Sequence, residues 1–451
     1  MTTSAVQPQP QPQPLPSASA GPGFRPARVL DVELTRPLPP VPGGEPYRRA
    51  WVLARLHTEP FGLFEAPLPA EGLLPDQLGT MLWRDLGPAI AARFADAGHQ
   101  PPSILTGDGL TANPVTWPFT RRRAAILAGA PPISVVVCTR DRPAQLETCL
   151  NRLQRQEYSR FEVVVVDNAP ATDVVERMVE RLAAGPARFR YHAEPRPGLS
   201  WARNAGIAAA DGDIIAFLDD DDEPDQHWLA GIATGFARDG AIGCVAGLIL
   251  PARLDTAAEE LFEQQGGHRL GRGFAPETFT RSGPQSPLFP LPPFGTGANM
   301  AFRRETLAGI GGFDVALGAG TRTFACEDTL AFTLALLSGY DIAYEPSALM
   351  WHHHRPDMDS LGRQLHGYSI GLTAFYAALL RHRPGVLPGL LRLLPAAGGY
   401  LKRGAAPQAA PDLLAELDRR HLQGLALGPL AYLRSVYEQS RAARPRRYAR
   451  L

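Results

Sequence analysis

The stretch ISVVVCTRDRPAQLETCLNRLQRQEYSRFEVVVVDN, residues 133–168, decides the fold class of this chain. It begins with a β-branched run, continues with an amphipathic segment, and ends with four valines followed by Asp167. Short, almost entirely apolar strands that alternate with helices are typical of a parallel sheet covered on both faces. We therefore predict an α/β protein whose ligands bind at the carboxyl ends of the strands.

Polar residues gather where the predicted strands end. CTRDRP follows the first strand and DNAP the second, while four consecutive acids, Asp219 to Asp222, follow the apolar run IIAFL. Carboxylates this close raise each other's pKa unless a cation or hydrogen-bond donors compensate, so we expect a positive partner there. A single acid such as Asp167 is equally well explained as a helix cap or turn residue.

Two kinds of cation site are compared with this acidic run, a calcium loop and a site for Mg²⁺ or Mn²⁺. A calcium-binding EF-hand loop has Gly at its sixth position and Glu at its twelfth. This chain has Pro224 and Ala230 there, which excludes the loop. Mg²⁺ or Mn²⁺ instead takes one or two carboxylates and completes its octahedron with phosphate oxygens. We therefore expect a divalent cation, Mg or Mn, shared with a bound diphosphate.

The composition excludes several function classes. The 451 residues include 45 basic and 45 acidic side chains, so no overall field favours nucleic acid, and we expect no nucleic-acid partner. Lys402 is the single lysine, which excludes a GKS or GKT phosphate loop and disfavours a pyridoxal phosphate Schiff base. The four cysteines form no CxxC pair, which is typical of reduced cytoplasmic thiols.

We divide the chain into a disordered Pro/Gln-rich tail at 1–26, a small accessory domain at 27–125, a catalytic α/β domain at 131–355 and a helical region at 356–451. The accessory domain is predicted from the strand-like run RRAWVLARLH and from apolar residues at helical spacing over 74–98.

Nothing in the chain predicts a transmembrane span or a signal peptide. The N-terminal segment lacks the basic-then-apolar order of a signal peptide, and no segment reaches roughly 18 to 20 uninterrupted apolar residues. Residues 361–394 read as two amphipathic helices that either cap the ligand site or rest on a membrane surface, and the terminal RAARPRRYARL is basic. We expect a cytoplasmic protein, with peripheral contact at the inner face of the membrane as an alternative to the packed cap.

Several motifs resemble, in order and spacing, the inverting family-2 glycosyltransferases of the GT-A fold. They are ISVVVCTRDRP, FEVVVVDNAP, PGLSWARNAGIAAADGDIIAFLDDDDEP, GTGANMAFRR, IGGFD and CEDTLAF, and they cover about half of the chain, residues 132–355. The resemblance implies a GT-A type, Rossmann-like, mostly parallel sheet flanked by helices. It also implies a nucleotide-diphosphate sugar as donor, with a UDP-sugar favoured.

The resemblance implies roles for the residues at the strand ends. Those expected to bind the nucleotide sugar are Thr139, Arg140, Asp141, Asp167, Arg203, Asp219 and Asp220. Those expected to hold the metal are Asp221, Asp219 and His352. The region facing donor and acceptor is expected to include Gly297, Asn299 and Arg303, although a plain strand explains Arg303 nearly as well.

The motif CEDT resembles the family's acidic catalytic motif, which makes Asp328 the general base and Glu327 its neighbour. An acceptor hydroxyl must lose its proton as it attacks the anomeric carbon, and a carboxylate within hydrogen-bond reach can take that proton. An acidic pair at a helix N-terminus explains the same residues and is compatible with catalysis.

The segment WHHHRPD raises the question of a zinc site. Adjacent residues of an extended segment point to opposite faces, so only His352 and His354 share a side. Two ligands do not make a structural zinc site. His352 remains open between a ligand of the donor metal and a buried or diphosphate-facing histidine.

The sequence as a whole predicts a metal-dependent inverting glycosyltransferase that moves one sugar to a hydroxyl of a glycan, a lipid carrier or a small metabolite. It lacks the QxxRW motif of processive members, which favours a single transfer. Two other classes are a nucleotidyltransferase that forms sugar nucleotides and a non-catalytic carbohydrate-binding or scaffold protein. This sequence lacks the glycine-rich signature that a nucleotidyltransferase carries after its first strand, and its intact acidic motifs disfavour a non-catalytic protein.

Overall fold

The structure is a computed structural model that describes residues 24–110, 117–183, 188–291, 293–393 and 411–442. Most of the predicted tail at 1–26 and most of the basic C-terminal segment lie outside these residues. No helix within the described ranges is both long and apolar enough to cross a membrane.

A nine-stranded sheet forms the centre of the chain, with the strand order β10-β12-β9-β11-β7-β4-β5-β6, and β8 pairs with β12. The strands that run parallel to one another are β4 (Ile133–Thr139), β5 (Phe161–Asn168), β6 (Arg188–Glu194), β7 (Ile214–Asp219), β9 (Ile242–Pro251) and β12 (Asp341–His352). The strands that run the opposite way are β8 (Asp222–Pro224), β10 (Glu277–Phe279) and β11 (Asn299–Arg303). The predicted mostly parallel α/β sheet is confirmed.

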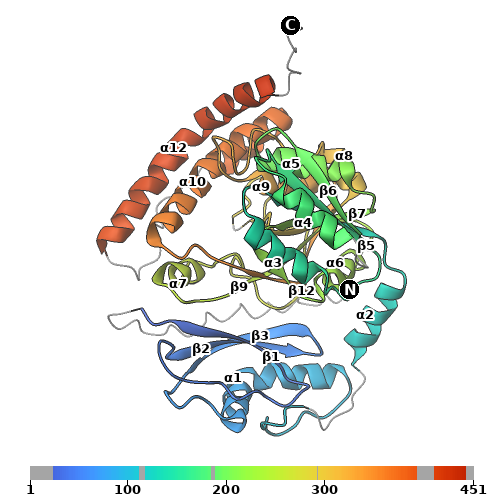
Figure 1. Ribbon diagram of the computed structural model, residues 1–451, viewed down its shortest axis with the longest axis vertical. Helices are drawn as coiled ribbons and strands as arrows, with labels where there is room; N and C mark the ends of the chain where they lie inside the picture. The colour runs from blue at the N-terminus through green and yellow to red at the C-terminus, as the bar shows by residue number, and fades with distance from the viewer. Residues whose placement is uncertain (1–23, 111–116, 184–187, 292, 394–410, 443–451) are drawn as a thin grey trace, which may run out of the picture.

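Helices cover both faces of this sheet because its central strands are apolar on both sides. Val135 and Val137 of β4 face one layer, while Val136 faces the other. The first layer consists of α3 (Pro143–Leu153), α4 (Val174–Ala183) and α6 (Trp228–Phe236). The second consists of α5 (Leu199–Ala209), α8 (Arg304–Ile310), α9 (Glu327–Leu337) and α10 (Met358–His382), and α12 (Pro411–Ala442) runs alongside α10 (Figure 1).

The N-terminal part forms a second, smaller sheet. It consists of β1 (Ala27–Glu33), β2 (Arg49–Leu56) and β3 (Glu59–Pro67), followed by α1 (Pro75–Asp96) and α2 (Pro118–Ala128). One face of this sheet packs on α1, and the other faces the large sheet (Figure 1). Trp51 and Leu53 of β2 belong to one apolar cluster with Leu248 and Leu250 of β9. The small sheet therefore shares an apolar core with the large one. A short helix, α7 (Ala257–Gln264), follows β9.

Candidate functional site

The register of the central strands brings the predicted strand-end residues together. Thr139 of β4 lies opposite Asp167 of β5, and Cys138 lies opposite Asp219 of β7. Asp167 is buried, accepts a hydrogen bond from the Tyr191 hydroxyl at 3.4 Å, and has a pKa raised by burial. These side chains share the carboxyl edge of the sheet, as the strand pattern predicts.

Two of the four consecutive acids are held by one arginine that the sequence did not single out. Arg142 lies 3.2 Å from Oδ1 of Asp220 and 3.1 Å from Oδ2 of Asp221. Asp220 also accepts a hydrogen bond from Oγ1 of Thr139 at 2.7 Å. Burial raises the pKa of Asp220 to about 6, even though the Thr139 hydroxyl and Arg142 favour its charged form. Protein donors thus compensate part of the repulsion within the run.

The first and last acids of the run face different partners. Asp219 accepts from Nη2 of Arg203 at 3.3 Å. Asp222 lies opposite His352 in the β8–β12 pair and accepts from its Nδ1 at 2.7 Å. Burial raises the pKa of Asp222 to about 7, although His352 favours the charged carboxylate. The other oxygen of Asp222, Oδ2, is buried and has no hydrogen-bond partner.

This orphaned oxygen belongs to a group that could hold a cation. Asp221, Asp222 and His352 each offer one ligand atom, and these atoms lie within 4.8 Å of one another. Two of the predicted metal residues, Asp221 and His352, are therefore brought together. Asp219 instead faces Arg203. Asp222 was missed, although its place in the acidic run was a signal, because its pairing with His352 depends on a long-range strand contact.

A buried arginine links the acidic run to the CEDT segment. Arg203 of α5 is 1 % exposed, and its Nη1 donates to Oε1 of Glu327 at 2.5 Å. Its Nη2 also donates to the carbonyl oxygen of Gly297 at 3.0 Å. Burial works against the charge on Arg203, but Glu327 and Asp219 outweigh it and raise the pKa of the guanidinium. Arg203 is therefore a fixed positive charge that contacts both the acidic run and the CEDT segment.

Asp328 is oriented by backbone donors at the start of α9. Its Oδ2 accepts from the Gly297 amide at 2.6 Å, and its Oδ1 accepts from the Thr329 amide at 2.6 Å. Cys326, just before the helix, has a left-handed φ of 71°. The tight turn at this residue leads directly into Glu327 and Asp328.

The structure does not bring every predicted residue to this site. Arg303 pairs with Ile214 at the opposite end of β7, because β11 runs antiparallel to that strand, and its Nε donates to the Ile242 carbonyl at 2.8 Å. Asn299 lies at the acidic end of β11, opposite Leu218 of β7, but its side chain is buried. Its hydrogen bonds go to Trp228 and to one backbone carbonyl each in β9 and β12. The two residues serve the packing of the sheet. The plain-strand alternative for Arg303 agrees with its position.

The turn after β4 is the open side of the site. Arg140 and Asp141 are largely exposed, their charged groups lie 3.8 Å apart, and Asp141 has a left-handed φ of 56°. Exposed side chains at a strand end can close over a ligand without first breaking a buried contact.

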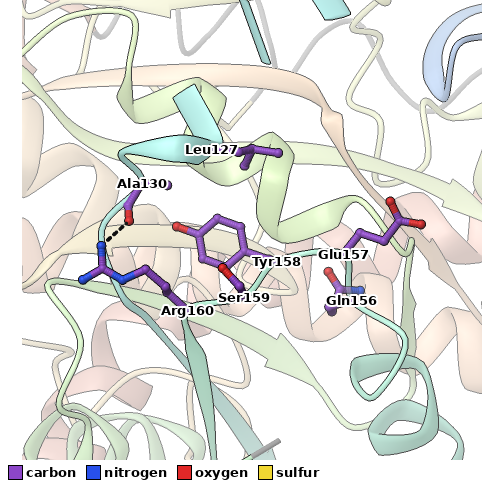
Figure 2. Close-up of a pocket in the computed structure, with 7 residues that line it drawn as sticks. All are labelled: Leu127, Ala130, Gln156, Glu157, Tyr158, Ser159 and Arg160. Carbon is purple, nitrogen blue, oxygen red and sulfur yellow. Dashed lines mark hydrogen bonds between the residues drawn. The ribbon is translucent and has the colours of Figure 1, made fainter. Parts of the chain in front are cut away.

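A pocket elsewhere on the chain lacks the character of a catalytic site. It has a volume of about 390 Å³ and is lined by Leu127, Ala130, Gln156, Glu157, Tyr158, Ser159 and Arg160 (Figure 2). The Tyr158 hydroxyl donates to the Pro131 carbonyl at 2.6 Å, and Arg160 donates to the Ala130 carbonyl at 2.9 Å. Its main polar groups are thus satisfied by backbone, and it contains none of the acids described above.

Residues 134–311 match the family model described as glycosyl transferase family 2. The succinoglycan biosynthesis protein ExoM of Rhizobium meliloti is 31% identical over 230 residues, which cover 49% of this chain and 66% of that protein. The uncharacterized protein y4gI of Sinorhizobium fredii is 28% identical over 52% of this chain, which spans 26% of that protein's length. A mannosyltransferase of Pyrobaculum calidifontis, solved in complex with GDP-Man and Mn²⁺, aligns with a TM-score of 0.41 and 19% identity over 72% of this chain and 94% of its own.

Proposed function

Because this chain belongs to glycosyltransferase family 2, whose model matches residues 134–311, we propose that it is a metal-dependent inverting enzyme that transfers one sugar from a nucleotide-diphosphate sugar to a hydroxyl acceptor. The observation that carries the proposal is the position of Arg203, which touches Asp219 of the acidic run and Glu327 of the CEDT segment. The buried guanidinium of Arg203 thereby connects the region proposed to hold the diphosphate to the region proposed to hold the general base. Membership of the family favours this function over a nucleotidyltransferase or a scaffold protein.

The donor nucleotide would lie along the carboxyl edge of β4 and β5. Asp167 would accept hydrogen bonds from the base, and Thr139 at the end of β4 would line the nucleotide together with Arg140 and Asp141 of the turn that follows. A UDP-sugar is the favoured donor.

The residues present fit a divalent cation, because Asp222 has a buried oxygen without a partner beside Asp221. Asp221 and Asp222 would hold the ion, and His352 would fix Asp222 through the bond to its other oxygen. His352 would thus act on the ion through Asp222, while Asp219 pairs with Arg203. When bound, the cation would neutralise charge that develops on the leaving diphosphate.

Asp328 would act as the general base. Its two oxygens are fixed by the amides of Gly297 and Thr329, so the carboxylate is held in one orientation before the acceptor arrives. As the acceptor oxygen forms its bond to the anomeric carbon, its proton passes to Asp328 and the bond to the diphosphate breaks on the opposite face. Arg203 would stabilise the negative charge that develops there, and the sugar would invert.

The acceptor would be a growing glycan, a lipid-linked sugar or a small molecule. The relative ExoM, named as a succinoglycan biosynthesis protein, favours a glycan among these. A lipid-linked acceptor requires access to a membrane surface. α12 offers a face for this contact, because its outward side exposes Leu422, Leu427, Leu430, Leu433 and Tyr437. The C-terminal stretch RAARPRRYARL, residues 441–451, is rich in arginine, which suits anionic lipid.

The membrane contact is tested by sedimentation with vesicles of phosphatidylglycerol and phosphatidylcholine. The double variant Leu430→Glu, Leu433→Glu should stay in the supernatant, whereas Gln423→Glu, which adds a charge on the same helix, should still sediment. Equal sedimentation of the two variants would show that this face does not touch lipid.

Calorimetric titration with UDP, GDP and TDP, each with and without Mn²⁺, tests the donor site. We expect one nucleotide to bind in a metal-dependent manner and Asp221→Ala to abolish that binding. Asp239→Ala, which changes an exposed acid in the loop before β9, is the matched control and should bind normally. Absence of diphosphate binding with Mn²⁺ present would refute the proposal.

A further inference from the structure

Three histidines meet beside the acidic run. His352 and His354 come from the end of β12, and His268 comes from the segment after α7. The ring centroids of His268 and His352 are 4.5 Å apart, and those of His352 and His354 are 5.3 Å apart. One nitrogen from each ring lies within 4.8 Å of the other two. The sequence showed only two of these residues, because His268 reaches them through the tertiary fold.

The hydrogen bonds of the cluster leave one nitrogen on each ring for a ligand. Asp222 occupies Nδ1 of His352, and Glu263 lies 2.8 Å from Nε2 of His354. The nitrogens that remain include Nδ1 of His354 and Nε2 of His268, both of which are buried without a hydrogen-bond partner. His354 is only 4 % exposed, so water does not readily replace the missing partners. Unsatisfied buried nitrogens in one cluster require an explanation.

The surroundings of these rings match those of metal-bound histidines. A ligating histidine almost always donates its other N–H to a carboxylate or a carbonyl, which fixes the tautomer and the ring orientation. Asp222 and Glu263 hold two of the three rings in this way.

We propose that His268, His352 and His354 bind a divalent transition-metal ion, Zn²⁺, at a site separate from the cation on Asp221 and Asp222. Three imidazole nitrogens suit Zn²⁺, whereas Mg²⁺ requires oxygen ligands. Three protein ligands leave a fourth position of the tetrahedron for water or an anionic group.

The ion would connect two segments that are distant in the sequence. It would tie the segment after α7 to the end of β12, with His352 as the residue that faces both metal sites. Nε2 of His352 would bind Zn²⁺ while its Nδ1 donates to Asp222. The zinc site would therefore position Asp222, one of the two carboxylates assigned to the donor cation.

The test is the metal content of the purified full-length chain after exhaustive dialysis, measured by mass spectrometry, followed by titration of chelator-treated protein with Zn²⁺ and with Co²⁺. We expect one equivalent of Zn²⁺ per chain and the visible absorption of tetrahedral Co²⁺. His268→Ala and His354→Ala should lose both signals. His353→Ala is the matched control, because its Nε2 pairs with Glu223 outside the cluster, and it should keep both.

Two further variants separate the possible outcomes. Glu263→Gln should weaken Zn²⁺ affinity about 10–100-fold. Because it keeps the size of the side chain, a loss of affinity in this variant is not explained by misfolding. Asp221→Ala should lose Mn²⁺-dependent nucleotide binding but keep Zn²⁺, so failure of the donor site and failure of the zinc site are distinguishable. A wild-type chain without stoichiometric Zn²⁺ after titration, or Zn²⁺ retained in His268→Ala, would overturn the assignment.

Discussion

Arg203 and Glu327 form a buried ion pair in which Nη1 of the guanidinium lies 2.5 Å from Oε1 of the carboxylate. The second nitrogen of the same fork reaches Asp219 at 3.3 Å and the Gly297 carbonyl at 3.0 Å. The partners come from α5 and α9, which are 124 residues apart at this point. One planar cation therefore fixes the distance between two acidic regions, which a single-point charge could not do.

Replacement of Arg203 by Lys tests whether the planar guanidinium, with its two donor nitrogens, is needed for turnover. The variant keeps a positive charge, but an ammonium cannot serve Glu327, Asp219 and Gly297 together. Turnover should fall on the order of 100-fold, measured as release of nucleoside diphosphate from the donor that calorimetry identifies. Arg190→Lys, which alters the ion pairs of the exposed Arg190 on β6 with Glu162 and Asp211, is the control and should be close to wild type. Wild-type turnover in Arg203→Lys would show that the planar geometry of the guanidinium is dispensable.

Asp328→Asn tests the base. The amide has nearly the same shape as the carboxylate but cannot take the acceptor's proton, so turnover should fall about 10²–10⁴-fold. Nucleotide affinity, measured by the same calorimetry, should change little. If nucleotide binding were lost and turnover at saturating donor were preserved, Asp328 would belong to the donor site and the assignment of the base would be wrong.

Gly297→Ala tests how closely the backbone approaches the catalytic groups. A Cβ at this position would lie 2.9 Å from Nη2 of Arg203 and 3.2 Å from Oδ2 of Asp328. Because Arg203 is buried and bonded on both sides, it cannot move away cheaply, and we expect a loss of turnover together with a lower melting temperature. Gly309→Ala, on α8, meets only ordinary contacts at 3.8 Å and should retain full turnover. Equal behaviour of the two variants would contradict the model of a tight site.

Asp314 links the C-terminal helices to the core and should make their docking sensitive to acid. Burial alone would raise its pKa, but hydrogen bonds from His382 and Tyr432, at 2.9 and 2.7 Å, outweigh burial and lower it. A lowered carboxylate pKa adds stability that is present above the unfolded value, 3.8, and is lost as pH falls through the folded value.

The measurement is the melting temperature of wild type and Asp314→Asn between pH 7 and pH 3. At pH 7 the variant should be less stable by about 1.5–3 kcal/mol, because it loses hydrogen bonds to a charged group. The difference between the two proteins should shrink as pH falls below about 4. A difference that stays constant over this range would mean that the charge on Asp314 contributes nothing.

The parts of this structure that local sequence patterns predict are the parallel strands and their polar ends. The apolar runs before Asp167 and Asp219 gave the correct strands, since a strand buried on both faces must be apolar throughout. The direction of β11 has no such local signature. Its antiparallel course carries Arg303 to the far end of the sheet from the acids.

The partners of the site residues were the least predictable part. Arg142, which holds Asp220 and Asp221, was passed over because nothing local distinguishes it from other arginines in a turn. His268 meets His352 only after α7 and β12 are in place. Contacts of this kind depend on the register between distant segments, which a single sequence does not encode as a pattern.

The shared core between the two sheets limits how the chain can be shortened. Arg55 of β2 is buried and pairs with Asp225, directly after β8, at 2.8 Å. A chain that begins at residue 131 would remove the ion-pair partner of this acid and would expose the apolar face of β9 around Leu248 and Leu250. Such a face favours aggregation. For expression and crystallisation, the N-terminal sheet should therefore be kept as an inseparable cover of the transferase fold.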